Sequence, residues 1–405
     1  MGEYSYGSQF MRDLDKEIMD LIVHGEDPKD PSKFNYLALK TWTFQFHNNT
    51  ILRKYSIEKY GIKSPNEINS YEDIPVIPSG GYKKWNIISF PEDLIPKGSI
   101  SPAEARAKGL ATHFTSSGSS SKTDEHGRPL VVGHFYRDPD SMNLFDATIT
   151  QAAKEYLFSD GIKRKFLLLS PTPEMFPYMP MIYDQELMRQ NFGTEDRIYL
   201  IGKEGFDARK FVEELKLAEK TGQPVMIGGA SFAFVSLFDG FKEKGLAFNL
   251  SNGSISVDGG GYKERSRDVP KQEFIEASSK MFGLPEDHVI NLLGYGEHPT
   301  LIYDNVFRNA LMRVNGSRYK PNLPWHKTLV VDPEKYPKET VFLKKGEKGI
   351  LRHFDLSDRG TVIAVQTDDE GELIEDGFEI WGRAKGAGAR GCSLAVEEMM
   401  KTITW

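Results

Sequence analysis

Small hydroxylated residues dominate the stretch from Thr115 to Ser121, whose composition suits phosphate binding. The stretch reads TSSGSSS and is followed by Lys122. Backbone N–H groups and hydroxyls of such an unobstructed loop can surround phosphate oxygens, and the lysine adds positive charge. Ser/Gly tracts are also typical of flexible linkers. The flanking segments carry ordered apolar patterns, which favours a phosphate-binding loop, although the sequence G-x-x-x-x-G-K-[ST] occurs nowhere in the chain.

A carboxylate stands at the end of an apolar run in VINLLGYGEHP, where Gly294, Tyr295, Gly296 and Glu297 follow the last leucine. The exit of a buried strand is where α/β sheets bind ligands, and the hard oxygens of a glutamate are natural Mg²⁺ ligands. The alternative is an ordinary strand end with a solvated glutamate. The neighbouring His298 can act as a base, although a lone histidine is more often structural.

Acidic residues follow a second apolar run in TVIAVQTDDEG. Thr367, Asp368 and Asp369 stand at its end. A carboxylate in this position can accept both hydroxyls of a ribose, as acidic residues do in dinucleotide sites. A β-turn around Asp-Asp-Glu-Gly is the alternative.

The single cysteine, Cys392, comes directly before Ser393, a suitable N-cap for a final helix. The thiol is therefore expected near the positive end of the helix dipole, close to Arg390 and other basic residues. Both effects favour the thiolate, which is the nucleophilic form. A small buried apolar residue is the alternative interpretation.

The glycines before this cysteine satisfy a dinucleotide-binding pattern. Gly386, Gly388 and Gly391 match G-x-G-x-x-G between an expected strand and a helix. The residues after Gly391 leave no room for the returning strand and ribose-binding acid of such a unit. We therefore expect a glycine-rich hinge that carries one thiol.

The apolar patterns predict an α/β chain. Residues 9 to 60 read as helices, and beyond residue 160 short β-rich runs alternate with helical periods, which indicates a partly parallel sheet. After about residue 320 the pattern changes to strands separated by turns, followed by one helix. The expected domains are residues 1–320, a small β-rich unit at 321–383, and a hinge with a helix at 384–405. Four phenylalanines after MIGGAS either line an acyl pocket or, more typically, form core: Phe232, Phe234, Phe238 and Phe241.

Composition excludes several classes of function. The net charge of −7 and pI near 5.8 argue against nucleic acid as a partner. No run approaches the roughly 20 apolar residues needed to span a bilayer. One cysteine excludes an internal disulfide and a multi-cysteine metal site. A reducing, cytoplasmic location fits these features.

Taken in order, the serine-rich loop, GGGYKE, YGE, QTDDEG and GRAKGAGARGCSL resemble the LuxE family, the acyl-protein synthetases of the bacterial luciferase system. This family lies within the superfamily of adenylate-forming acyl and aryl ligases, and the resemblance runs from about residue 70 to the end. It implies an α/β fold with a large N-terminal adenylate-forming domain of mixed sheets and helices and a small C-terminal segment. It also implies ATP and Mg²⁺ as cofactors.

The resemblance assigns roles to individual residues. In the superfamily the serine-rich loop holds the ATP phosphates, the strand-end glutamate helps bind Mg²⁺, and the aspartate of the T-x-D-x-G turn binds the ribose. In acyl-protein synthetases a cysteine near the C-terminus carries the acyl group. The matching residues are Ser116, Ser117, Gly118, Ser119, Ser120 and Ser121 for phosphate; Gly259, Gly260, Gly261 and Lys263 on the adenine side; Tyr295, Gly296 and Glu297 at the strand end; Asp369 for ribose; Arg383 at the hinge; and Cys392 for the acyl group.

The chain also departs from the superfamily pattern. The loop usually reads T-S-G-T-T-G-x-P-K, whereas Ser121 replaces the second glycine here, and Thr123 and Asp124 replace Pro-Lys. Larger ligases add a C-terminal domain with a catalytic lysine, whereas only residues 384–405 follow Arg383. The charge of the leaving pyrophosphate must then be neutralised by other groups or by a partner protein.

The resulting prediction is an enzyme that uses ATP to convert a carboxylic acid, expected to be a fatty acid, to acyl-AMP. The acyl group then passes to Cys392 as a thioester and onward to a partner protein. One alternative is a ligase that delivers an aryl or small acid to coenzyme A, an amine or a carrier without acylation of Cys392. The other is a non-catalytic nucleotide-binding subunit. Formation of an oligomer is compatible with the sequence under each interpretation.

Overall fold

The computed structural model describes residues 2–26, 30, 32–98, 100–116, 132–262, 266–386 and 394–400. Contacts divide the chain into two compact units: unit 1 comprises residues 1–148, 295–300 and 320–405, and unit 2 comprises residues 149–294 and 301–319. Helices and strands occur in both units, so the predicted mixed α/β class is confirmed. The domain ranges expected from the sequence stay a prediction. The strands of residues 321–383 fall in unit 1, as do the N-terminal helices.

Three helices open unit 1, as the periodicity of residues 9 to 60 predicted: α1 (Gln9–His24), α2 (Lys33–Asn48) and α3 (Thr50–Tyr60). The side chain of Ser8 caps α1 by accepting a hydrogen bond from the amide of Met11, and Asn49 caps α3 in the same way. Gly61 ends α3 in the left-handed conformation that glycine adopts without strain. The buried face of α1 consists of Met11, Leu14, Ile18, Leu21 and Ile22.

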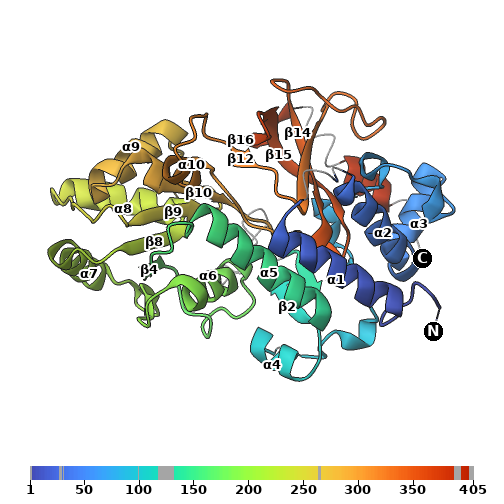
Figure 1. Ribbon diagram of the computed structural model, residues 1–405, viewed down its shortest axis with the longest axis horizontal. Coiled ribbons are helices and arrows are strands. Elements are labelled where there is room, and N and C mark those ends of the chain that lie inside the picture. The colour runs from blue at the N-terminus through green and yellow to red at the C-terminus, as the bar shows by residue number, and fades with distance from the viewer. Residues whose placement is uncertain are drawn as a thin grey trace. The chain divides into compact units, whose positions relative to one another are not determined.

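The large sheet of unit 1 is mainly antiparallel, with strand order β12-β16-β15-β14-β13 (Figure 1). Its strands are β12 (Lys320–Pro321), β13 (His326–Val331), β14 (Lys348–Asp355), β15 (Ala364–Ile374) and β16 (Gly377–Arg383). Strand β1 (Ile77–Pro78) pairs in parallel with β15. A separate antiparallel hairpin, β2 (Thr112–Thr115) and β3 (His134–Arg137), flanks the serine-rich segment.

Unit 2 is built on a sheet of order β11-β10-β9-β8-β4-β5, in which only β11 runs antiparallel to its neighbour (Figure 1). The strands are β4 (Lys165–Leu169), β5 (Ile198–Tyr199), β8 (Val225–Ala230), β9 (Ile255–Gly259), β10 (Val289–Leu293) and β11 (Ile302–Tyr303). The predicted partly parallel α/β sheet is therefore confirmed. Its crossover helices are α6 (Pro180–Phe192), α7 (Ala208–Thr221), α8 (Ser231–Glu243) and α9 (Lys271–Phe282).

The core of unit 2 contains the phenylalanines of α8. Phe234, Phe238 and Phe241 are at most 5% exposed and belong to one apolar cluster with residues of β8, α7 and α9. Phe241 lies 6.0 Å from the ring of Phe211 on α7. For these three side chains the interpretation as plain core is confirmed, whereas Phe232 at the start of α8 is only partly buried.

The remaining elements are short or lie outside these two sheets. They are α4 (Pro102–Ala107), α5 (Pro139–Tyr156), α10 (Val306–Met312), the pair β6 (Ile201–Gly202) and β7 (Gly205–Phe206), the 3-10 helices η1 (Pro65–Glu67), η2 (Tyr71–Asp73), η3 (Ser79–Lys83), η4 (Glu92–Leu94), η5 (Glu286–His288) and η6 (Leu356–Asp358), and a helical segment at 394–400. Among the described residues, no helix has the length and apolar character required to cross a membrane.

Candidate functional site

The segment Tyr295–Thr300 belongs to unit 1, although the residues before and after it belong to unit 2. It follows directly on the carboxyl end of β10, where the sequence predicted a ligand site. Side chains of unit 1 hold both of its ends. The Tyr295 hydroxyl lies 2.7 Å from Nε2 of His353, and the amide of Thr300 donates to the carboxylate of Asp355 over 3.3 Å.

The Glu297 carboxyl group lies in a partly buried, charged environment. Burial is the largest influence and raises the pKa of Glu297 above its usual value, and the charge of Asp369 raises it further. The residue's own amide, His298 and Arg383 act in the opposite direction. A bound cation would relieve this burial cost, because it favours the ionised carboxylate.

Asp369 and Arg383 are register partners on two neighbouring strands of unit 1, β15 and β16. Nε of Arg383 lies 3.4 Å from the carboxylate of Asp369, and Nη1 lies 3.9 Å from that of Asp368. Burial raises the pKa of the Asp369 carboxyl, whereas Arg383 lowers it. The Arg383 side chain is 73% exposed and Asp369 only 13%, so the guanidinium is accessible and the carboxylate is sheltered.

Tyr295 lies in the same charged environment as Glu297, Asp369 and Arg383. Burial raises its pKa well above the usual value, and the charges of Asp369, Glu297 and Arg383 all act on it. The structure thus brings four predicted site residues of unit 1 within electrostatic range of one another. The pKa of His353 lies well below its usual value because of burial, so this ring is neutral. A neutral ring can accept the Tyr295 hydroxyl on Nε2 and donate from Nδ1 to Thr328, 3.0 Å away.

The structure describes only the first two residues of the serine-rich segment, Thr115 and Ser116. The amide of Ser116 donates to Gly133 over 2.9 Å, and its hydroxyl accepts from the Gly133 amide over 2.8 Å. This pair lies one residue beyond the last strand pair, Thr115 and His134, at the end of the hairpin where the serine-rich segment begins. Five predicted phosphate-binding residues lie outside the described residues, together with Lys122: Ser117, Gly118, Ser119, Ser120 and Ser121.

The glycines predicted for the adenine side lie in unit 2. Gly259 is the last residue of β9, and a side chain there would meet the carbonyl oxygen of Leu292 at 2.9 Å. Gly260 and Gly261 have φ values of 78° and 66°, a conformation that side chains rarely adopt. Glycine is therefore required here by backbone geometry. Lys263 lies outside the described residues.

Cys392 also lies outside the described residues, as do Gly388 and Gly391. The helical segment 394–400 that follows is packed into unit 1. Ala395 and Met399 are fully buried, and a side chain at Gly80 would meet Val396 at 2.8 Å. Glu398 pairs with Lys59.

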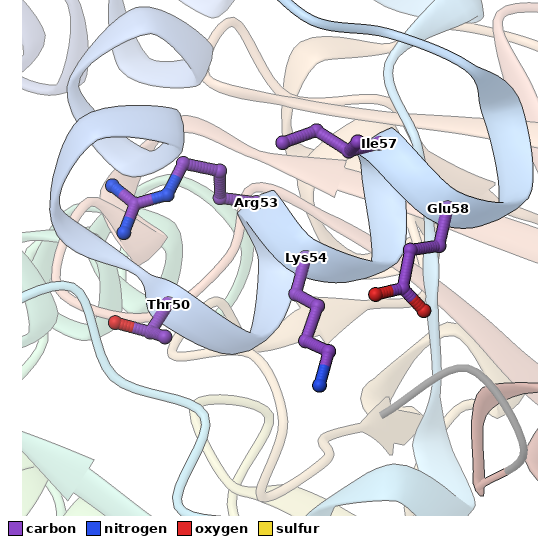
Figure 2. Close-up of a pocket in the computed structure, with 5 residues that line it drawn as sticks. All are labelled: Thr50, Arg53, Lys54, Ile57 and Glu58. Carbon is purple, nitrogen blue, oxygen red and sulfur yellow. The ribbon is translucent and has the colours of Figure 1, made fainter. Parts of the chain in front are cut away.

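A shallow hollow occurs along α3, lined by Thr50, Arg53, Lys54, Ile57 and Glu58. Figure 2 shows that all five side chains project from this one helix. None of them is a predicted site residue, and binding pockets typically combine polar groups from several elements. This hollow is therefore not the candidate site.

The described residues contain no group of three or more His, Cys, Asp or Glu side chains arranged to hold a metal ion. Mg²⁺ commonly binds through one or two carboxylates together with substrate phosphates, and it keeps several waters. The single carboxylate of Glu297 fits such a shared site and does not fit a cage made by the protein alone.

Several residues that shape the site carry no signal in the sequence. Arg137, His353 and Asp358 are at most 2% exposed and contact the Tyr295–Thr300 segment. Their partners lie between 58 and 160 residues away along the chain. Local spacing and hydrophobic periodicity report only near neighbours, so neither reveals these contacts.

Gly296 is a position where any side chain should be harmful. An added Cβ would lie 2.0 Å from Cε2 of Phe135, a residue that is 1% exposed and also contacts Tyr82. We expect Gly296→Ala to lower the free energy of unfolding by about 1–3 kcal/mol, as overpacking does. Urea unfolding measures this change. Gly240→Ala on α8 is the control, because nothing lies within 4 Å of its added Cβ and it should not destabilise the protein.

A family model described as acyl-protein synthetase, LuxE, matches residues 183–401, which is more than half of the chain. Among solved structures, an open conformation of 2-hydroxyisobutyryl-CoA ligase in complex with 2-HIB-AMP and CoA aligns with a TM-score of 0.55 and 12% identity over 87% of this chain and 70% of that chain. The same ligase in the thioesterification state aligns with a TM-score of 0.53 and 13% identity over 94% and 70% of the two chains. At these identities the likeness shows a shared fold. No curated protein sequence matches the chain.

Proposed function

Because the chain belongs to the LuxE family of acyl-protein synthetases and has the fold of an adenylate-forming ligase, we propose that it activates a fatty acid with ATP and Mg²⁺ and passes the acyl group to Cys392 and then to a partner protein.

The observation that carries the proposal is the grouping of Tyr295, Glu297, Asp369 and Arg383 in unit 1. These residues come from a segment after β10 and from two paired strands. The family resemblance matches Glu297 to Mg²⁺ binding and Asp369 to ribose binding. Two acidic side chains and one guanidinium can each bind a different part of a nucleotide. Glu297 would hold the cation on the phosphates, Asp369 would accept the ribose hydroxyls, and Arg383 would bind phosphate or carboxylate oxygen.

The first step brings two anions together. A carboxylate oxygen of the acid attacks the α-phosphorus of ATP, the bond to the β-phosphate oxygen breaks, and pyrophosphate leaves. Mg²⁺ on Glu297 and N–H donors of the serine-rich loop would reduce the repulsion and stabilise the charge that accumulates on pyrophosphate.

The second step is acyl transfer. The Cys392 thiolate attacks the acyl carbonyl carbon of the mixed anhydride, and AMP leaves with the electron pair of the broken C–O bond. Delivery within one chain gives the thiol a high effective concentration. For this step the site therefore needs mainly to hold the acyl carbonyl within reach of the Cys392 thiolate.

Pyrophosphate exchange with a panel of acids tests the proposal. Labelled pyrophosphate should enter ATP only when a suitable acid and Mg²⁺ are present, and straight-chain fatty acids should support more exchange than benzoic acid or short acids. Exchange with benzoic or short acids alone would favour the aryl or small-acid ligase. The absence of exchange with every acid, with and without an added partner protein, would favour the non-catalytic nucleotide-binding subunit.

Asp369→Asn should raise the KM for ATP about tenfold, because an amide forms weaker hydrogen bonds to ribose hydroxyls than a carboxylate does. Exchange rates at varied ATP concentration measure this effect. Asp368→Asn is the matched control: it removes a charge at the adjacent position, where the side chain is 46% exposed. Equal KM values in the two variants would remove Asp369 from the proposed ribose contact.

A further inference from the structure

Arg137 is a buried cation at the end of strand β3, in the hairpin that carries the serine-rich segment. Its side chain is 2% exposed. Nη2 donates to the main-chain carbonyl oxygens of both Gly296 and Glu297, at 3.1 Å each. One guanidinium nitrogen therefore holds the two peptide groups on either side of the Glu297 Cα atom.

The other terminal nitrogen of Arg137 is held by a buried carboxylate. Nη1 lies 2.9 Å from Oδ1 of Asp358 and donates to the Thr361 hydroxyl over 3.1 Å. The Thr361 hydroxyl donates to the same Asp358 oxygen over 2.6 Å. The second oxygen of Asp358 lies 2.7 Å from Nδ1 of His298, the residue directly after Glu297. Asp358 thus fixes both the guanidinium and the far side of the Glu297 turn.

A second buried pair supports the first one. Arg359 follows Asp358 in the chain, and its guanidinium binds Asp138, which follows Arg137, with Nη2–Oδ1 and Nη1–Oδ2 distances of 3.0 and 3.1 Å. Nε of Arg359 also donates to Asp15 on α1 over 2.8 Å. Two adjacent residues at the end of β3 are therefore each paired with one of two adjacent residues at 358–359.

From this arrangement we infer that Arg137 is the positioning residue for Glu297, and that it fastens the serine-loop hairpin to the turn that carries this carboxylate. The inference rests on the proposed role of Glu297 in binding Mg²⁺ with ATP. Arg137 acts only through the backbone of Glu297 and has no assigned contact with the nucleotide. A shift of that backbone would leave a buried guanidinium without its two carbonyl acceptors, so the turn is held in one position.

This role predicts a defect in Mg²⁺ and ATP binding. Lysine has one ammonium group in place of the planar fork, so it cannot bind the two carbonyls and Asp358 at the same time. We expect Arg137→Lys to raise the KM for ATP about tenfold. We also expect a higher Mg²⁺ concentration for half-maximal exchange and a smaller change in kcat.

Arg164→Lys is the matched control. Arg164 is also fully buried, it donates to the carbonyls of Gly253 and Ile162 over 2.5 and 3.1 Å, and it pairs with Asp160. It precedes β4 in unit 2, at the amino end of that strand. A general loss of packing should lower the melting temperature of both variants, whereas only Arg137→Lys should change the KM for ATP and the Mg²⁺ requirement.

The decisive measurement is pyrophosphate exchange at varied ATP and Mg²⁺, with the acid that gives the highest rate in the unaltered protein. Equal shifts in the two variants would overturn the inference. If Arg137→Lys does not fold, Asp358→Asn takes its place, since it removes the charge that orients Arg137 but keeps the side-chain shape; it should raise the same two quantities, and unchanged values would overturn the inference. No exchange in the unaltered protein would count against the proposed function.

Discussion

Replacing Glu297 with glutamine should reduce acid-dependent pyrophosphate exchange by about 100- to 1000-fold, because the proposed site loses the only carboxylate assigned to Mg²⁺. Glutamine keeps the size and shape of the side chain but binds a hard cation weakly. The exchange rate at saturating acid, measured over a range of Mg²⁺ concentrations, gives the magnitude. A variant that retains more than a tenth of the exchange rate would show that another group holds the cation.

Glu297→Gln should lower the exchange rate without lowering the stability of the fold. Burial raises the pKa of Glu297 in the folded chain, so folding favours its protonated form. The stability that this group contributes is present below its unfolded-state pKa and is lost as the pH rises through the folded-state pKa. Glutamine resembles the protonated acid, so Glu297→Gln should be at least as stable as the original protein at neutral pH. Thermal unfolding at pH 7 tests this expectation, and a clear fall in the melting temperature would contradict it.

The same pKa predicts how activity depends on pH. Only the ionised carboxylate binds Mg²⁺ well, so exchange should fall as the pH is lowered through a value above the usual glutamate pKa. Activity and this contribution to stability therefore have opposite pH dependence. A functional carboxylate in a site that burial makes unfavourable for its charge is a common feature of active sites.

Continuous apolar runs and capped amphipathic helices made much of the fold predictable. The run KFLLLS became β4, which is buried along its whole length. Helix α7 (Ala208–Thr221) has Asp207 as its N-cap and Gly222 as its C-cap, two residue types that typically mark helix ends. In both cases the signal is local, because the residues that define the element lie within it.

Strand β9 has no continuous apolar run to mark it in the sequence, because polar residues occupy two of its buried positions. It reads ISVDG, and the side chains of Ser256 and Asp258 are at most 5% exposed. Ser256 accepts a hydrogen bond from Ser278 over 3.1 Å, and Asp258 accepts one from Ser231 over 2.7 Å. These partners come from distant parts of the chain, and without them such polar residues would not be stable inside a sheet.

The residues of the candidate site could be proposed where a motif carries its own chemistry, and their binding roles stay predictions. The motifs predict Glu297, Asp369 and Arg383 as site residues, and in the structure their charges act on one another. The residues that hold this group in place have no such motif. Arg137 reaches Glu297 across 160 positions and Tyr295 reaches His353 across 58, and nothing in the local pattern of either segment requires its partner.

Replacing Cys392 with alanine should remove covalent acylation completely while leaving pyrophosphate exchange within twofold of the original rate. Adenylate formation is finished before the thiol reacts, so the first step does not need this side chain. Exchange and the recovery of labelled acyl-protein, measured with the same acid, separate the two steps. Labelled protein from the unaltered chain should lose its label in neutral hydroxylamine, as a thioester does.

The composition of the chain makes this result unambiguous. Cys392 is the one cysteine among 405 residues, so no second thiol of the same chain can replace it. Stable label that persists in Cys392→Ala would have to lie on oxygen or nitrogen and would exclude this cysteine as the sole carrier. If the variant instead transfers the acyl group to added coenzyme A at the original rate, the thiol of Cys392 is not an intermediate. The enzyme would then be a ligase that delivers its adenylate directly to a small thiol.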